Sequence, residues 1–176
     1  AGYAGMVLSP GGYDGVARVH DNIFVDNHAP EALIVWISGD ATFEHNLVML
    51  SSSGPSAAFG AGVLEPIEFL TSLTVRQNTF ASTLGDTIPL IGGSQFAATS
   101  QVVVNNAFAS HDGGFVIAAA PNPLQYNLVW DAPGGAWALG VLPPTNLTTD
   151  PMFAALRNGP ASALNLVPRA GSPLID

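Results

Sequence analysis

The chain has 176 residues and contains neither cysteine nor lysine. Without cysteine it cannot form a disulfide, so cysteine usage does not indicate the compartment in which the protein works. Its permanent cations are four arginines, which stand against thirteen carboxylates and leave a net charge of −9. A chain this acidic has little with which to displace counterions from a phosphate backbone, so we do not expect it to bind nucleic acid.

The sequence also lacks long apolar runs. Its nearest approach, GGFVIAAAP, is well short of the ~20 residues that a membrane-spanning helix needs, so no transmembrane segment is predicted. No basic segment precedes a long apolar stretch near the start, so no signal peptide is visible. The acidic, lysine-free composition, rich in alanine, glycine, serine and threonine, is nevertheless typical of exported bacterial proteins. It favours an extracellular, periplasmic or cell-surface location.

A short pattern centred on an asparagine recurs five times along the chain. An apolar residue stands three positions before each asparagine, and another stands two positions after it. The segments are VHDNIF, FEHNLV, VRQNTF, VVNNAF and LQYNLV, with asparagines Asn22, Asn46, Asn78, Asn106 and Asn127. Because consecutive asparagines are separated by 24, 32, 28 and 21 residues, the pattern predicts a repeat architecture.

A second apolar element follows most of these asparagines by about ten residues. It is rich in β-branched and aromatic residues and is bounded by turn-forming residues, which is typical of short strands. No segment carries a 3.6-residue apolar period with caps at both ends, so helices are not expected. Stacked repeats would align Val19, Phe43, Val75, Val103 and Leu124 in one buried column, about 4.8 Å apart. We therefore predict an all-β parallel β-helix, a single-domain solenoid of about five coils.

The five asparagines have a structural role in such a solenoid. Asparagine tolerates the left-handed backbone conformation that a sharp corner requires, so we expect the asparagines themselves to adopt it. A carboxamide can also bond to the carboxamides of the coils above and below, which satisfies buried polar groups. The sequence therefore predicts an asparagine ladder along one corner of the solenoid.

The chain ends in the stretch DPMFAALRNGPASALNLVPRAGSPLID. Its prolines cannot continue a strand ladder, so it is expected to close the solenoid. We predict coils over residues 1–149 and an irregular C-terminal capping segment of the same domain over residues 150–176. Leu164, Leu166 and Ile175 are expected to cover the core of the last coil.

These features resemble the right-handed parallel β-helix superfamily, which includes pectate-lyase-like enzymes, phage tailspikes and many bacterial surface proteins. The ending is similar to that of secreted bacterial proteins of the choice-of-anchor Q type, which close with Asp-Pro-x-Phe and Gly-Ser-Pro-x-Ile-Asp elements. Here these elements are Asp150, Pro151 and Phe153, then Gly171, Ser172, Pro173, Ile175 and Asp176. The resemblance implies a right-handed helix and export. In departure from the family's pattern, we expect no sorting anchor after the ending and no amphipathic cap before the first coil.

Alignment of the asparagines also aligns the polar residues that precede them in the first three coils: His20, Asp21, Glu44, His45, Arg76 and Gln77. Because alternate strand residues face outward, His20, Glu44 and Arg76 should form one exposed column whose opposite charges stabilise each other modestly. In an enzyme, Glu44 and Asp21 would supply the acid and the base or nucleophile for glycoside hydrolysis. A histidine, His20 or His45, would be an alternative base, with Arg76 holding a uronate carboxylate.

Two functions remain open at this point. The first is a non-enzymatic exported or cell-surface protein, structural or adhesive, and the absence of three carboxylates on adjacent coils favours it. Its first coil is expected to be uncovered near Met6–Leu8. Either the chain is a fragment of a longer protein, or this coil packs against a protein partner or another copy of the chain. The second is a carbohydrate-binding or polysaccharide-degrading β-helix protein, a lyase or glycosidase, with Trp36, Trp130 and Trp137 as candidates for stacking on sugars.

Motifs for metals and cofactors are weak. Histidine stands beside aspartate at 20–21 and 111–112, but adjacent strand residues point to opposite faces of a sheet. No phosphate-binding loop, nucleophile elbow or metalloprotease signature is present. We therefore expect neither a metal nor a cofactor. The weaker alternative is calcium in the turns that carry Asp26, Asp112 or Asp131.

Overall fold

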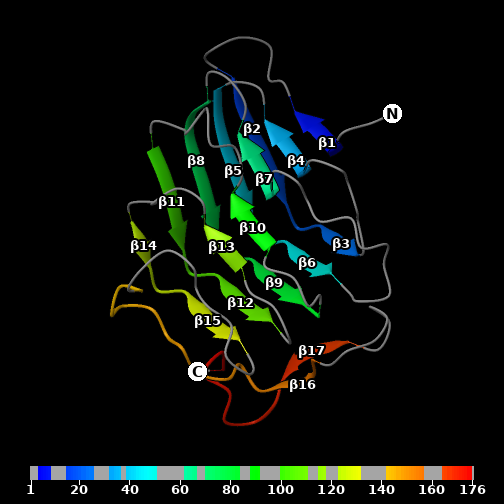
Figure 1. Ribbon diagram of the computed structural model, residues 1–176, viewed down its shortest axis with the longest axis vertical. Helices are drawn as coiled ribbons and strands as arrows, with labels where there is room; N and C mark the ends of the chain where they lie inside the picture. Colours follow the sequence, from blue (N-terminus) through cyan, green and yellow to red (C-terminus); the bar gives the residue numbers. More distant parts are fainter. Residues whose placement is uncertain are drawn as a thin grey trace.

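The computed structural model describes residues 4–8, 15–25, 32–36, 39–50, 62–66, 70–83, 88–91, 100–110, 115–117, 123–131, 142–156 and 164–175. Within these ranges the chain forms seventeen strands and no helix (Figure 1). The predicted all-β class is therefore confirmed for the described residues. The same ranges contain no helix that could cross a membrane.

Fifteen strands form three parallel sheets of five strands each. Sheet A comprises β1 (Ala4–Leu8), β4 (Ala32–Trp36), β7 (Gly62–Pro66), β10 (Ile88–Ile91) and β13 (Phe115–Ile117). Sheet B comprises β2 (Val16–His20), β5 (Gly39–Glu44), β8 (Leu70–Arg76), β11 (Ser100–Val104) and β14 (Leu124–Gln125). Sheet C comprises β3 (Ile23–Val25), β6 (Leu47–Leu50), β9 (Thr79–Ser82), β12 (Ala107–Ser110) and β15 (Leu128–Asp131).

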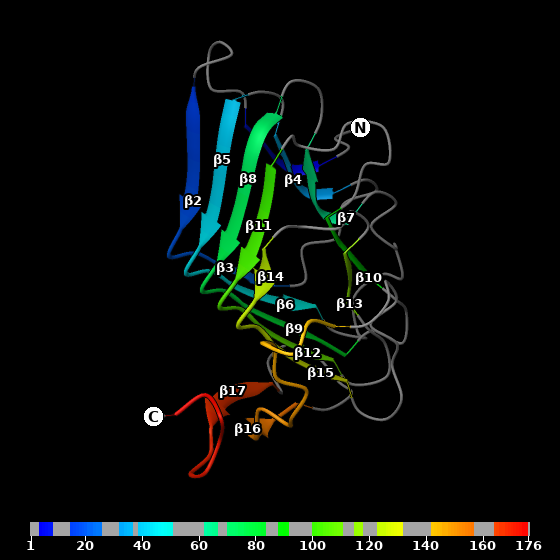
Figure 2. The same cartoon turned by 90° about the vertical axis from the view of Figure 1, so that its left-hand side faces the viewer.

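Consecutive strands along the chain belong to sheets A, B and C in turn. Each strand pairs with the strand that comes three positions later in the chain, in the same sheet. The chain therefore stacks five three-strand units, from β1–β3 to β13–β15, in a solenoid-like arrangement. Figure 2 shows sheets B and C meeting along a line of sharp corners, one for each unit. This line of corners is where the asparagines lie.

The register predicted from the asparagine alignment is confirmed in sheets B and C. Across sheet B the paired residues are Val19, Phe43, Val75, Val103 and Leu124. Across sheet C they are Phe24, Val48, Phe80, Phe108 and Val129. The members in the middle of each column are buried, and they form the apolar core of the described part of the chain.

Four phenylalanines of this core stack on one another and connect the two sheets. The ring centroids of Phe24 and Phe43 lie 5.9 Å apart, and those of Phe43 and Phe80 lie 6.0 Å apart. The rings of Phe80 and Phe108 are closer, with centroids 5.0 Å apart and an angle of 13° between the ring planes. Phe43 belongs to sheet B and the other three belong to sheet C. Each such pair contributes about 0.5–1.5 kcal/mol beyond the burial of its area.

A ladder of asparagine side chains follows the corner between sheets B and C. Its members are Asn22, Asn46, Asn78, Asn106, Asn127 and Asn146. From the second member onward, each Oδ1 accepts two hydrogen bonds from the asparagine of the preceding unit, one from its backbone N–H and one from its Nδ2. Each Nδ2 also reaches backbone carbonyls, as Asn78 does with Phe43 at 2.8 Å and Arg76 at 2.9 Å.

Asn146 is the sixth member of the ladder, and the sequence pattern did not predict it. The residues three before and two after it are Pro143 and Thr148, so it lacks the flanking hydrophobic residues that define the pattern. The Asn-Leu dipeptide that it shares with two other units was the available signal. Its Nδ2 donates to the carbonyl oxygens of Leu124 and Pro143, each at 3.0 Å, so the ladder ends there with its last donor satisfied.

The left-handed backbone conformation falls one residue before each of the first five asparagines, so its predicted position is wrong. The left-handed residues at the five corners are Asp21, His45, Gln77, Asn105 and Tyr126, with φ between 54° and 57°. Because the chain turns before the asparagine, the asparagine can direct both its N–H and its Nδ2 to a single Oδ1 of the next unit. The side chains of the five left-handed residues are all exposed, and we call them the corner row.

The two remaining strands, β16 (Phe153–Ala155) and β17 (Asn165–Pro168), pair antiparallel and lie beside sheet C (Figure 2). Leu166 lines two cavities together with residues of the corner row and of sheet C. The expected cover over the core of the last coil is therefore wrong for Leu166, and Ile175 is half-exposed. The reason lies on the outer surface of sheet C, which is apolar at Ala107 and Leu128. Those two residues are only 6% and 3% exposed.

We predict that removing an asparagine from the middle of the ladder destabilises the protein much more than removing one from its exposed end. Asn78→Ala should lower the free energy of unfolding by about 3 kcal/mol or more, because it leaves several buried partners unsatisfied. Asn22→Ala should cost less than about 1 kcal/mol, because Asn22 is exposed and its partners can turn to water. Urea denaturation of both variants checks this, and equal losses would contradict a cooperative buried ladder.

A second prediction concerns Gln101 of β11, which is 7% exposed and faces the core beside Leu73. Its Oε1 has no hydrogen-bond partner among the described residues. Gln101→Met keeps the length of the side chain and removes the unpaired oxygen, so it should raise the free energy of unfolding by about 1 kcal/mol. A loss of stability in urea or thermal unfolding would show that this oxygen is satisfied in solution.

Candidate functional site at the corner of sheets B and C

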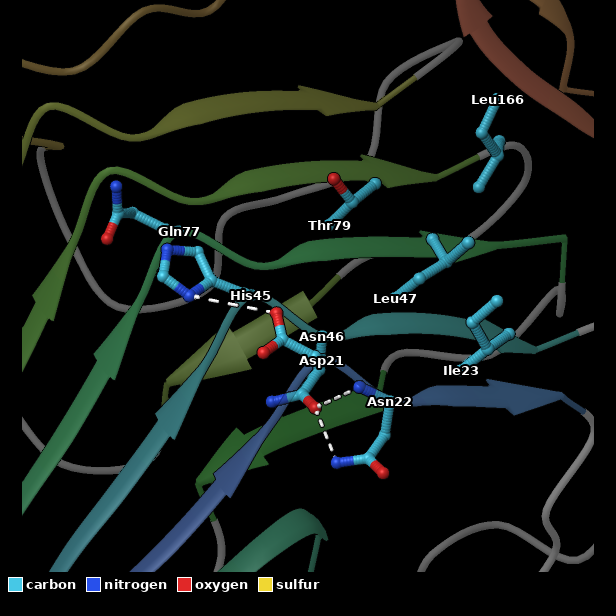
Figure 3. A pocket seen from close by; sticks show the side chains of 9 residues that line it. All are labelled: Asp21, Asn22, Ile23, His45, Asn46, Leu47, Gln77, Thr79 and Leu166. Carbon is cyan, nitrogen blue, oxygen red and sulfur yellow. Dashed lines mark hydrogen bonds and ion pairs between the residues drawn. The ribbon is translucent and has the colours of Figure 1, made fainter.

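Asp21 lies between two histidines at the first two corners. Its Oδ2 is 2.8 Å from Nδ1 of His20. Its Oδ1 is 4.0 Å from Nδ1 of His45, as Figure 3 shows by a dashed line. All three side chains are exposed. The hydrogen bond with His20 is the main cause that holds the pKa of Asp21 below its usual range, and the nearby charges of His45 and Arg18 act in the same direction. Asp21 therefore presents an ionised carboxylate at neutral pH.

Glu44 is enclosed by two arginines. The register places His20, Glu44 and Arg76 side by side across sheet B, as expected. The expected exposed column is nevertheless wrong at Glu44, whose side chain is 0% exposed. Both Nε and Nη2 of Arg18 contact its Oε1, and Nε of Arg76 donates to its Oε2 at 2.6 Å. The two half-exposed arginine side chains cover the carboxylate from neighbouring strands.

Arg18 is the functional neighbour that the sequence pattern missed. It stands four residues before Asn22, outside the segment shared by the five repeats. Its outward position on β2, two residues before His20, was the available signal. Burial alone would raise the pKa of Glu44, but the hydrogen bonds from Arg76 and Arg18 outweigh it and lower the pKa below its ordinary value. Glu44 is therefore ionised and shielded from solvent.

This arrangement limits the acid–base chemistry of the two carboxylates. Glycoside hydrolysis requires a carboxyl group that carries a proton in the resting enzyme, which is obtained by raising its pKa. The pKa values of Asp21 and Glu44 are both lowered. Glu44 also has both oxygens occupied by guanidinium groups. Asp21 can accept hydrogen bonds from a ligand, Glu44 is already paired, and neither carboxyl is prepared to donate a proton.

Two adjoining cavities lie between the corner row and the strand β17. The first has a volume of about 540 Å³ and is lined by Asp21, His45 and Gln77 on one side. In Figure 3, Ile23, Leu47 and Thr79 follow one another on neighbouring strands of sheet C, and Leu166 lies across from them. The second cavity has a volume of about 780 Å³ and shares Gln77, Thr79 and Leu166 with the first.

The second cavity continues along the later corners. Gln77, Asn105 and Tyr126 line it from the corner row. The segment around β16 and β17 contributes the apolar side chains of Phe153, Leu166, Pro168, Pro173 and Leu174. None of the described residues that line this cavity is charged, whereas Asp21 and His45 line the first.

Several residues predicted from the sequence have no described side chain. Asp26, Asp112 and Trp137 fall outside the described ranges, and only the backbone is described for Trp36 and Asp131. Trp130 is half-buried in β15. The described residues contain no group of three or more histidine or carboxylate side chains that could hold a metal ion. Calcium in the turns therefore stays a prediction.

Comparisons with known proteins add nothing to this site. No protein-family model matches the chain, and no curated protein or solved structure is significantly similar to it. Any function must therefore rest on the chemistry of the described residues.

The arginine-enclosed carboxylate predicts a pH dependence of stability. The pKa of Glu44 in the folded protein lies below the ordinary value of 4.5. Its ionised form therefore stabilises the fold above that pH, and this contribution is lost as the pH falls through the folded-state pKa. Glu44→Gln should lower the free energy of unfolding by about 1–2 kcal/mol at neutral pH. The difference from the wild type should shrink steadily below pH 4.5, as measured by urea unfolding across the pH range.

Asp40→Asn provides the matched control. Asp40 lies on the same strand, is exposed, and accepts a hydrogen bond from Ser72 at 2.7 Å. Its substitution removes one carboxylate, as Glu44→Gln does, but should change stability by no more than about 0.5 kcal/mol. If the stabilities of the two variants change with pH in the same way, the enclosure of Glu44 by the arginines adds nothing to stability beyond the effect of net charge.

Proposed function

We propose that this chain is a non-enzymatic component of an exported or cell-surface bacterial assembly, built as a right-handed parallel β-helix of about five coils. The pairing of every third strand in three parallel sheets supports the β-helix. The strong general preference for right-handed crossovers between parallel strands supports its hand. The acidic, lysine-free composition supports export.

The observation that carries the proposed assembly is the edge formed by β2 and β3. These strands end sheets B and C, and no described strand pairs with their outer edges. Val16 and Ile23, one on each strand, are both 69% exposed. Every later Oδ1 of the ladder accepts two hydrogen bonds, but that of Asn22 accepts none from a described residue. Terminal strands of a sheet with exposed apolar side chains recruit strands from other chains.

The candidate acid–base residues support the same choice. A lyase or glycosidase acting through Glu44 and Asp21 would need at least one of these carboxyls to exchange protons with a substrate. Glu44 is covered by Arg18 and Arg76, and the pKa of Asp21 is lowered by His20. These contacts suit a stabilised surface better than a catalytic pair. We therefore place the degrading enzyme second.

Self-association of the chain tests this proposal. The wild type should form oligomers whose fraction rises with concentration, measured by light scattering coupled to size-exclusion chromatography. Ile23→Lys should shift the chain to monomer, because a lysine on an exposed edge strand opposes pairing with another edge.

Val167→Lys is the control, because Val167 is 65% exposed and belongs to β17, not to β2 or β3. It should leave the oligomer unchanged, and circular dichroism should show both variants folded. A wild type that stays monomeric over the whole concentration range would contradict the proposed assembly. Equal dissociation of both variants would place the contact elsewhere.

A further inference from the structure

We infer that the second cavity, between the corner row and the strands β16 and β17, is a binding site for an uncharged carbohydrate. Its volume of about 780 Å³ lies in the ~300–1,000 Å³ range of small-ligand sites. One wall is built from hydrogen-bonding side chains and the other from apolar side chains. The inference goes beyond the proposed assembly, because the cavity lies along later units and not at the edge of β2 and β3.

The polar wall consists of Gln77, Asn105 and Tyr126, one from each of three consecutive units. Their left-handed backbone turns all three exposed side chains outward in the same way. No described residue forms a hydrogen bond with any of the three side chains, so two carboxamides and a phenol are available to a ligand. Neighbouring strands are spaced by about 4.8 Å, so the wall offers polar groups at a regular interval.

The backbone beneath this wall is already paired. The N–H of Gln77 donates to Val104 at 3.4 Å, and that of Asn105 donates to Gln125 at 3.3 Å. A peptide strand therefore finds no free ladder to extend here, and recognition must come from side chains. That requirement favours a carbohydrate, whose hydroxyls bond to side-chain amides, over an extended peptide, whose affinity comes chiefly from main-chain hydrogen bonds.

The apolar wall suits the other face of a sugar ring. Phe153, Leu166 and Leu174 line it, and the ring of Tyr126 is 62% exposed at the same cavity. A pyranose has a C–H face that packs on such surfaces and an equatorial hydroxyl edge that needs partners. An aromatic ring with a polar tip contacts both parts.

The net charge of the chain and the uncharged lining of the second cavity favour a neutral carbohydrate over an acidic one. The chain carries a net charge of −9, and within the part of the chain that the structure describes, the residues that line the second cavity are all uncharged. An acidic polysaccharide would therefore meet a repelling field and no arginine to hold its carboxylates. A neutral glycan is not repelled by the field and needs no arginine partner. In this respect the site differs from the uronate site considered around Arg76.

The test is titration of the full chain with neutral hexasaccharides of glucose, mannose, xylose, galactose and N-acetylglucosamine, with a hexagalacturonate as the acidic comparison. Calorimetry and NMR shift mapping report affinity and location. At least one neutral hexasaccharide should bind, and the hexagalacturonate should not. Tyr126→Ala should weaken binding about tenfold through the loss of the ring contact, and Gln77→Ala should weaken it several-fold. Tyr126→Phe should retain most of the affinity.

Ser100→Ala is the matched control, because Ser100 is exposed on β11 but lines neither cavity. It should bind as the wild type does. The inference is overturned if no neutral hexasaccharide binds, if only the hexagalacturonate or an extended control peptide binds, or if Tyr126→Ala and Gln77→Ala leave the affinity unchanged. Light scattering on the same samples keeps the two proposals apart. A monomer that binds sugar overturns only the assembly, and an oligomer that binds none overturns only the site.

Discussion

The hydrogen bonds between successive asparagine carboxamides are the interaction on which the rest of the described structure depends. The four bonds from Asn46 onward are made in a buried corner, where an unsatisfied carboxamide would cost about 1–3 kcal/mol. They hold consecutive units in one register, and that register brings the phenylalanines into a stack. A slip of one residue would turn every side chain of a strand to the opposite face. The ladder and the core therefore reinforce the same alignment.

The same corner produces the candidate sites. A left-handed residue other than glycine costs about 1–2 kcal/mol, and the asparagine bonds that follow it offset this cost. Since the left-handed residue points outward and the ladder does not use its side chain, its identity can differ from unit to unit. Aspartate and histidine occupy the early corners and glutamine, asparagine and tyrosine the later ones. One scaffold thus carries a charged end and a neutral end on a rigid frame, the arrangement that positions binding groups well.

The sequence predicted the features that repeat and missed those that do not. The inward columns, the strand pairing and five ladder members all follow from one pattern read at five positions. The burial of Glu44 depends on Arg18, a single residue outside that pattern. The position of β17 depends on apolar outward residues such as Leu128, which local sequence does not distinguish from other outward residues. The left-handed position was misassigned because asparagine's own backbone preference points to it, whereas the shared acceptor requires the turn to come earlier.

The ladder also has a direction. Every carboxamide donates from its own unit to the next, so the side-chain dipoles align head to tail along the stack as peptide dipoles do in a helix. At Asn146 the positive end is neutralised by two backbone carbonyls. At Asn22 the negative end meets no described donor, so partial negative charge collects on an exposed oxygen beside Ile23. Whatever adds to that edge must bring N–H groups or a cation to it, and a surface of carbonyls or carboxylates is repelled.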